Sequence, residues 1–219
     1  MDIKQLLKTF KKEDFFNSVN LHIHSNYSDG VEDFDSLVDQ AKKLNMKYIS
    51  ITDHNSVEGY RNSKYKNDSI LIPGVEFDCF YKTSPLHILG LGVDVDHKEL
   101  NKLCSREKND FIRLLKSRHP KKVIDTIHQS GGIAILAHPC CSFVISLKNY
   151  IKSLKKLGLD GVEVYYPYER LRGFVKFSSR QKAAIITKEL CLLESGGTDE
   201  HSKLIKDQAS QSKCTSDPR

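Results

Sequence analysis

Short apolar runs alternate with amphipathic segments along most of this chain, and this alternation limits the fold more than any other feature of the sequence. Seven runs have the length and composition of strands: residues 19–24, 48–52, 70–80, 86–92, 132–137, 161–166 and 192–197. Between them lie stretches with helical periodicity: residues 34–44, 100–115, 122–129, 147–157 and 174–189. Since a parallel strand pair needs a crossover that can hold a helix, this order predicts mostly parallel strands with helices outside.

The third and fourth runs break this pattern. Only residues 81–85 separate them, which predicts an antiparallel hairpin or a distorted section of the sheet. Seven strands suit a closed or nearly closed barrel. We therefore predict an α/β fold, a distorted seven-stranded (β/α)7 barrel that is TIM-like but lacks the regular eightfold pattern.

The domain organisation follows from the same pattern. No Pro/Gly/Ser-rich break divides the 219 residues into comparable halves, which indicates one domain. We expect a helical extension at residues 1–18, because lysines and apolar residues mix there as in a short amphipathic helix. The barrel is expected at residues 19–207 and a frayed polar tail at residues 208–219.

Composition argues against a disordered chain, a membrane-spanning helix and a framework of disulfides or zinc-binding cysteines. Apolar content of 39% and charged content of 28% are those of an ordinary soluble chain, and no apolar run reaches the ~20 residues that a membrane-spanning helix needs. The six cysteines have no Cys-x-x-Cys spacing, and no secretion signal accompanies them, so we expect reduced thiols and a cytoplasmic location. A net charge of +6 favours an anionic partner, but only weakly.

Metal-binding residue types recur at the ends of the predicted strands, where a barrel of parallel strands places its catalytic groups. Nine residues make up this set: His22, His24, Asp29, His54, Glu76, His87, His138, Asp199 and His201. The three other histidines, His97, His119 and His128, fall in helical or linker sequence and are expected at the surface.

The spacing of His22 and His24 has a direct structural meaning, because a period of two places both imidazoles on one face of a strand. Alone, such a pair is equally well explained by packing. Repetition on strand after strand favours metal binding, since a core with six imidazoles and three carboxylates would be costly to desolvate without ions.

The size and chemistry of this set indicate which ions it would bind. Nine ligands exceed what one ion can use, so two or three divalent ions are implied. Imidazole and carboxylate ligands without thiolate suit manganese, zinc or iron.

The ordered motifs resemble those of the PHP (polymerase and histidinol phosphatase) domain family of metal-dependent phosphoesterases. The resemblance covers about residues 19–201 and rests on His22-x-His24 with Ser28-Asp29-Gly30, Thr52-Asp53-His54, Gly74-Val75-Glu76, His87, Ala137-His138-Pro139 and Gly197-Thr198-Asp199-Glu200-His201. It implies a distorted seven-stranded barrel with a trinuclear site. Asp29 and the segment 161–167 are similar to the nucleotide or small-phosphate branch, although a histidine is common where Tyr166 stands.

The resemblance also implies how the ligands are shared among three ions. One ion would be held by His22, His24, Glu76 and Asp199, a second by Glu76, His87 and His138, and a third by Asp29, His54 and His201. Glu76, Asp199 and His201 are the residues expected to be catalytic. One departure from the family is a shortened insertion, since only about residues 106–124 occupy its place.

These features predict a phosphatase or phosphodiesterase that acts on nucleotides or other small phosphorylated metabolites with a metal-bound hydroxide. Two alternatives stay open: a nuclease that trims short oligonucleotide ends, and a metal-stabilised, non-catalytic module that assists a partner.

Several neighbouring residues allow two interpretations. Asp53 is equally well explained as a partner of a nearby histidine or as a cap of the next turn. Arg61 could bind a phosphate, whereas Lys116, Arg118, Lys121 and Lys122 are better explained as a solvated patch, and Cys140-Cys141 as small apolar residues.

Overall fold

The computed structural model describes residues 2–82, 84–104, 118–168 and 177–202. Its strands are β1 (Val19–Ile23), β2 (Tyr48–Ile51), β3 (Gly74–Tyr81), β4 (Ser84–Leu91), β5 (Ile133–Leu136), β6 (Gly161–Tyr165) and β7 (Leu193–Gly196). Its helices are α1 (Ile3–Thr9), α2 (Asp14–Asn17), α3 (Phe34–Lys43), α4 (Glu58–Asn62), α5 (Lys98–Leu103), α7 (Pro120–Gln129), η1 (Pro139–Cys141), α8 (Leu147–Lys155) and α9 (Arg180–Glu189).

The strands form a mixed α/β fold, as predicted. Five of them make one sheet in the order β3-β4-β5-β6-β7, and β1 pairs in parallel with β2 in a second sheet. The predicted hairpin is confirmed, because β3 and β4 pair antiparallel along their whole length. The β4–β5 pair is also antiparallel, whereas β5–β6 and β6–β7 are parallel.

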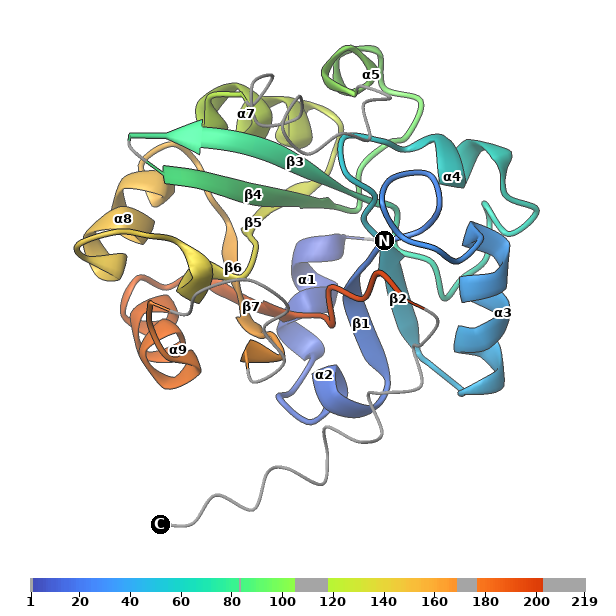
Figure 1. The fold of residues 1–219 in the computed structure, drawn as a ribbon, viewed down its shortest axis with the longest axis horizontal. Coiled ribbons are helices and arrows are strands. Elements are labelled where there is room, and N and C mark those ends of the chain that lie inside the picture. Colours follow the sequence, from blue (N-terminus) through green and yellow to red (C-terminus); the bar gives the residue numbers. More distant parts are fainter. Residues whose placement is uncertain (1, 83, 105–117, 169–176, 203–219) are drawn as a thin grey trace.

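The two sheets meet at isolated backbone bridges. Ile23 of β1 pairs with Glu200 beyond β7, Ile49 of β2 pairs with Leu71, and His54 pairs with Glu76. Figure 1 shows β1 next to the end of β7, with β2 on the other side of β1. The described residues contain no continuous seven-stranded ladder, so the closed barrel stays a prediction.

Two predicted boundaries were wrong for local reasons. The third run was expected to begin at residue 70, but residues 70–72 pair with β2 through Ile49, and β3 begins only after Pro73. The last helix was expected from residue 174, but α9 begins at Arg180, because the Ser179 side chain accepts a hydrogen bond from the amide of Lys182 and caps it.

Other predicted segments lie partly or wholly beyond the described residues. The helix predicted at 100–115 corresponds to α5 as far as Leu103, and residues 105–117 are outside the described part of the chain. This range also holds most of the shortened insertion. The predicted tail at 208–219 also lies outside the described part of the chain.

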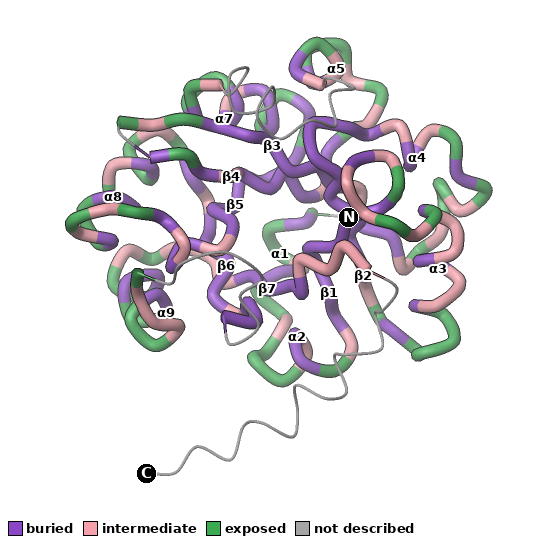
Figure 2. The backbone as a smooth tube through the Cα atoms, viewed as in Figure 1, coloured by how far each residue is buried: buried purple, intermediate pink, exposed green. Residues whose placement is uncertain are grey.

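The N-terminal helix belongs to the core. Asp2 caps α1, and the buried side chains of Ile3 and Leu7 pack with Leu89 and Ile133 from the five-stranded sheet. The strands run through the buried interior, while the outward sides of the helices are exposed (Figure 2). No helix among the described residues is long and apolar enough to cross a membrane. The five cysteines in this part of the chain are free thiols.

Candidate metal centre

The structure brings all nine predicted ligand residues together at one place. His22 and His24 lie at the end of β1, His54 follows β2, His138 follows β5, and Asp199 and His201 follow β7. Glu76 and His87 are different, because both lie inside the β3–β4 hairpin. Since β4 runs antiparallel to β3, the early part of β4 reaches the same region as the ends of the parallel strands.

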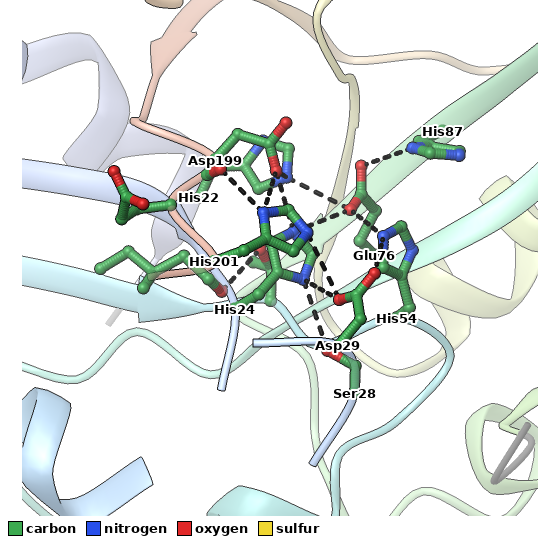
Figure 3. A network of polar contacts seen from close by, with 12 residues as sticks. His22, His24, Ser28, Asp29, His54, Glu76, His87, Asp199 and His201 are labelled. Atoms are coloured by element: carbon green, nitrogen blue, oxygen red, sulfur yellow. Dashed lines mark hydrogen bonds and ion pairs between the residues drawn. The ribbon is translucent and has the colours of Figure 1, made fainter. Parts of the chain in front are cut away.

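Glu76 is the centre of this cluster (Figure 3). Its Oε2 atom lies 3.2 Å from His22 Nε2, 3.1 Å from His24 Nε2 and 3.4 Å from His54 Nε2. Its Oε1 atom lies 3.0 Å from His87 Nδ1 and 3.4 Å from His138 Nε2. Five imidazoles therefore surround one buried carboxylate.

Asp199 faces the two histidines of β1 from the opposite side. Its Oδ1 atom lies 3.3 Å from His22 Nε2 and 3.1 Å from His24 Nε2, and the Tyr166 hydroxyl donates to Oδ2 over 2.9 Å. The approach of this segment to β1 depends on Gly197, because a Cβ atom there would lie 2.4 Å from the Cβ atom of His22.

Asp29 forms a third group with His201 and His54. Its Oδ1 atom lies 3.3 Å from His201 Nε2, and its Oδ2 atom lies 3.7 Å from His54 Nε2. His24 Nδ1 also lies 3.7 Å from Asp29 Oδ1, so His24 faces two of the groups with its two nitrogens.

The donor atoms of the centre fit divalent ions. Both oxygens of Glu76 and the Nε2 atoms of His22 and His24 are buried without a hydrogen-bond partner, which is costly unless a cation compensates them. Besides a set formed by His54, Asp78 and His87, three sets offer ligand atoms within 4.8 Å of one another: His22, His24, Glu76 and Asp199; Glu76, His87 and His138; and His24, Asp29, His54 and His201. They match the ion groups implied by the family motifs, with His24 added to the third.

Histidines and carboxylates shift the pKa values of one another in this cluster. Burial lowers the pKa of His24, but Asp199 and Glu76 outweigh burial and raise it to about 10. For His22, burial again lowers the pKa, and three nearby carboxylates raise it well above its ordinary value. Burial raises the pKa of Glu76, whereas the surrounding histidines lower it well below its usual range. Without ions, the raised pKa values of His22 and His24 favour protonated rings beside the carboxylates, whereas burial lowers the pKa of His54.

Sequence reasoning missed two acidic residues behind the imidazoles. Glu163 Oε1 lies 2.9 Å from His22 Nδ1, and its Oε2 accepts the backbone N–H of His138 over 2.8 Å. Asp78 Oδ1 lies 3.3 Å from both His54 Nδ1 and His87 Nε2. The available signal was an acidic residue alternating with apolar ones inside a buried strand, the same period of two that identified His22 and His24.

Asp53 takes neither of the two roles that the sequence left open. Its carboxylate accepts hydrogen bonds from the amide and hydroxyl of Ser25 and from the hydroxyl of Ser28. Ser28 Oγ in turn lies 3.5 Å from His24 Nδ1. Asp53 therefore fixes the loop after β1, which carries Asp29, and reaches a histidine only through Ser28.

The residues expected outside the centre lie outside it. His97 and His119 cap α5 and α7, and His128 pairs with Asp160. Lys121 and Lys122 are exposed, as expected for a solvated patch, and Lys116 lies outside the described residues. Arg118 departs from that expectation, because it is half-buried and donates to Asn55 Oδ1 and to the carbonyl of Leu103.

Known proteins resemble this chain over most of its length. A phosphoribosyl 1,2-cyclic phosphate 1,2-diphosphodiesterase of Eggerthella lenta is 22% identical, over 84% of this chain and 94% of its own. A 5'-3' exoribonuclease of Haemophilus influenzae is 26% identical, over 83% of this chain and 89% of its own.

Solved structures share the fold. The chain matches an amidohydrolase from Chromobacterium violaceum, determined with bound sulfate, with a TM-score of 0.70 and 19% identity over 84% of this chain and 88% of the other. The family model of the PHP domain matches residues 20–169, which carry seven of the nine residues of the centre. This chain belongs to the PHP domain family.

Proposed function

We propose that this chain is a metal-dependent phosphoesterase that hydrolyses phosphate esters of nucleotides or other small phosphorylated metabolites. The observation that carries the proposal is Glu76, a buried carboxylate within 3.0 to 3.4 Å of five imidazole nitrogens, with no hydrogen-bond partner for either oxygen. Such an arrangement suits a carboxylate that bridges ions. Two or three ions of manganese, zinc or iron fit the ligand sets.

The distorted barrel is part of the same proposal. The isolated bridges between β1 and the end of β7, and between β2 and the start of β3, lie where a seven-stranded barrel would close. The TM-score of 0.70 to a solved structure supports a shared fold. A cytoplasmic location is consistent with the free thiols, and it stays a prediction.

The residues of the centre divide into a buried floor and an open side. The side chains of His22 and His24 are fully buried and that of Glu76 is 1% exposed, whereas His87 is 24% and His201 is 36% exposed. A substrate phosphate would therefore enter between His87 and His201. Bound divalent ions would supply phosphoryl polarisation and lower the pKa of water from 15.7 to about 7.

The protein side chains would bind and position the ions. Glu76 and Asp199 would supply negative charge to the ions, and the Tyr166 hydroxyl, which donates to Asp199, would help to position that carboxylate. His201 lies on the open side and is the member of the predicted catalytic set that a substrate would meet first. No serine or cysteine nucleophile is required.

A nuclease that trims oligonucleotide ends is the second candidate. It is favoured by the similarity to an exoribonuclease over 83% of this chain. A non-catalytic module is disfavoured, because all nine ligand positions are filled and their side chains meet.

The proposal is tested by assaying the purified chain with Mn²⁺, Zn²⁺ or Fe²⁺ against para-nitrophenyl phosphate, nucleotides, cyclic phosphodiesters and short RNA. We expect turnover that requires a metal and is abolished in His22→Ala. The matched control is His128→Ala, since His128 pairs with Asp160 and belongs to none of the ligand sets. Metal-loaded protein that is inert on every substrate would refute the enzyme and leave the non-catalytic module.

A further inference from the structure

Asp78 lies directly behind the proposed metal centre. It follows Glu76 by two residues on β3, so both carboxylates are on the same face of the strand. In the β3–β4 hairpin its cross-strand partner is His87. The residue is 5% exposed, and a carboxylate so buried needs partners.

Two imidazoles, one after β2 and one on β4, provide those partners. Asp78 Oδ1 lies 3.3 Å from His54 Nδ1 and 3.3 Å from His87 Nε2. The opposite nitrogen of each ring faces the centre: His54 Nε2 is 3.4 Å and His87 Nδ1 is 3.0 Å from the Glu76 carboxylate. Asp78 therefore touches the outer edge of both rings.

A neutral imidazole carries one N–H and one lone pair, so an acceptor at one nitrogen determines which nitrogen can bind an ion. We infer that Asp78 is a positioning residue of the metal centre, which holds His54 with Nε2 and His87 with Nδ1 toward the ions. This inference rests on the proposed metal centre. His54 and His87 share one set with Asp78 itself, but they belong to different sets among the predicted ligands, so one carboxylate would orient ligands of two ions.

Asp78 is itself fixed by a chain of polar contacts. The Asn55 side-chain amide donates to Asp78 Oδ2, and the Asp78 backbone N–H donates to Asn55 Oδ1 over 3.3 Å. Arg118 Nη1 donates to the same oxygen over 2.8 Å. These contacts leave Oδ1 aimed at the two rings.

Glu163 is a second buried acid behind the centre, but it contacts one imidazole and one backbone amide. It contacts His22 Nδ1 and the backbone N–H of His138, two further residues of the ligand sets. The inference makes one specific prediction about His87. This residue would bind its ion through Nδ1, whereas His22 and His54 present Nε2 to Glu76.

The test uses the full chain with ¹⁵N-labelled histidine and bound Zn²⁺. Long-range ¹H–¹⁵N correlation spectra should show His54 protonated at Nδ1 and His87 protonated at Nε2. In Asp78→Ala the protons of the two rings should no longer be restricted to these nitrogens. Chelator competition should show that this variant binds Zn²⁺ about 10 to 100-fold more weakly than the wild type. Asp78→Asn keeps an acceptor oxygen and should recover part of the affinity. Asp160→Asn, which disturbs the contact with His128, is the matched control and should bind like the wild type.

Three results would overturn the inference: His87 bound through Nε2 in the wild type, wild-type affinity in both Asp78 variants, or loss of one whole equivalent of Zn²⁺ in Asp78→Asn, which would make Asp78 a ligand. Circular dichroism checks that Asp78→Ala is folded, and Asp78→Asn answers the question if it is not. A wild-type chain that binds no Zn²⁺ would instead overturn the proposed function and this inference with it.

Discussion

The centre contains the nine predicted ligands, grouped around Glu76, Asp199 and Asp29, and two further acids that contact the imidazoles from behind. The first group was accessible from the sequence, because histidines and acids recur at strand ends. The second group, Glu163 and Asp78, was not identified, because an acid inside a strand acquires its role only from the ring that packs against it.

Glu163→Gln should weaken metal binding about 10 to 100-fold, since it removes the charge that makes His22 a stronger ligand. Chelator competition followed by elemental analysis would measure the change. Glu189→Gln is the matched control, because Glu189 pairs with Lys148 at the surface. If Glu163→Gln binds the metal as tightly as the wild type, the contact at His22 Nδ1 does not contribute to metal affinity.

The metal-free chain should lose stability as the pH rises from about 6.5 to about 10. The folded-state pKa of His24 is raised from 6.5 to about 10, so its contribution is fully present below 6.5 and is lost as the pH rises through the folded value. Thermal unfolding in EDTA would show a falling midpoint. With Mn²⁺ the stabilisation should instead grow with pH, because protons compete less for the imidazoles. A flat profile in EDTA would contradict the ion pairs.

At the scale of elements, connection length was the most reliable signal. The short link between residues 80 and 86 predicted the β3–β4 hairpin, and this hairpin carries Glu76 and His87 into the centre. Helix starts were harder to predict from the sequence, since α9 begins where Ser179 caps it and not where the apolar pattern begins.

The N-terminal helix should contribute directly to stability. Leu7 is 3% exposed and packs in the same cluster as Leu89 and Ile133, so Leu7→Ala should cost about 2 to 5 kcal/mol of unfolding free energy. Urea denaturation would measure this value. Lys8→Ala, at an exposed position on the same helix, should change it little. A Leu7→Ala protein as stable as the wild type would mean that α1 packs only loosely.

At the scale of the whole molecule, two sheets share one centre while few backbone bridges join them. His22 and His24 come from the two-stranded sheet and Glu76 from the five-stranded sheet, so ions bound there would hold the sheets together.

Removing the metal should therefore loosen the junction between the sheets before the sheets themselves. Hydrogen exchange in EDTA should speed up at two backbone amides of this junction: that of His24, which donates to the Glu200 carbonyl, and that of Asn55, which donates to the Glu76 carbonyl. The β4–β5 pairing is the internal control and should keep its protection. Uniform acceleration throughout the chain would argue against a role of the ions at the junction.

The sequence alone determined the predicted ligand types, their order and the association of most of them with strand ends, since these depend on local periodicity; Glu76 and His87 lie inside the β3–β4 hairpin instead. It also determined the α/β class and the hairpin, which depend on segment lengths. Only the tertiary structure decided which nitrogen of each imidazole faces Glu76, that Asp53 contacts Ser25 and Ser28, and that Asp78 and Glu163 contact the outer nitrogens of the imidazoles. Such roles depend on distances of about 3 Å between residues far apart in the chain, and packing of whole elements sets those distances.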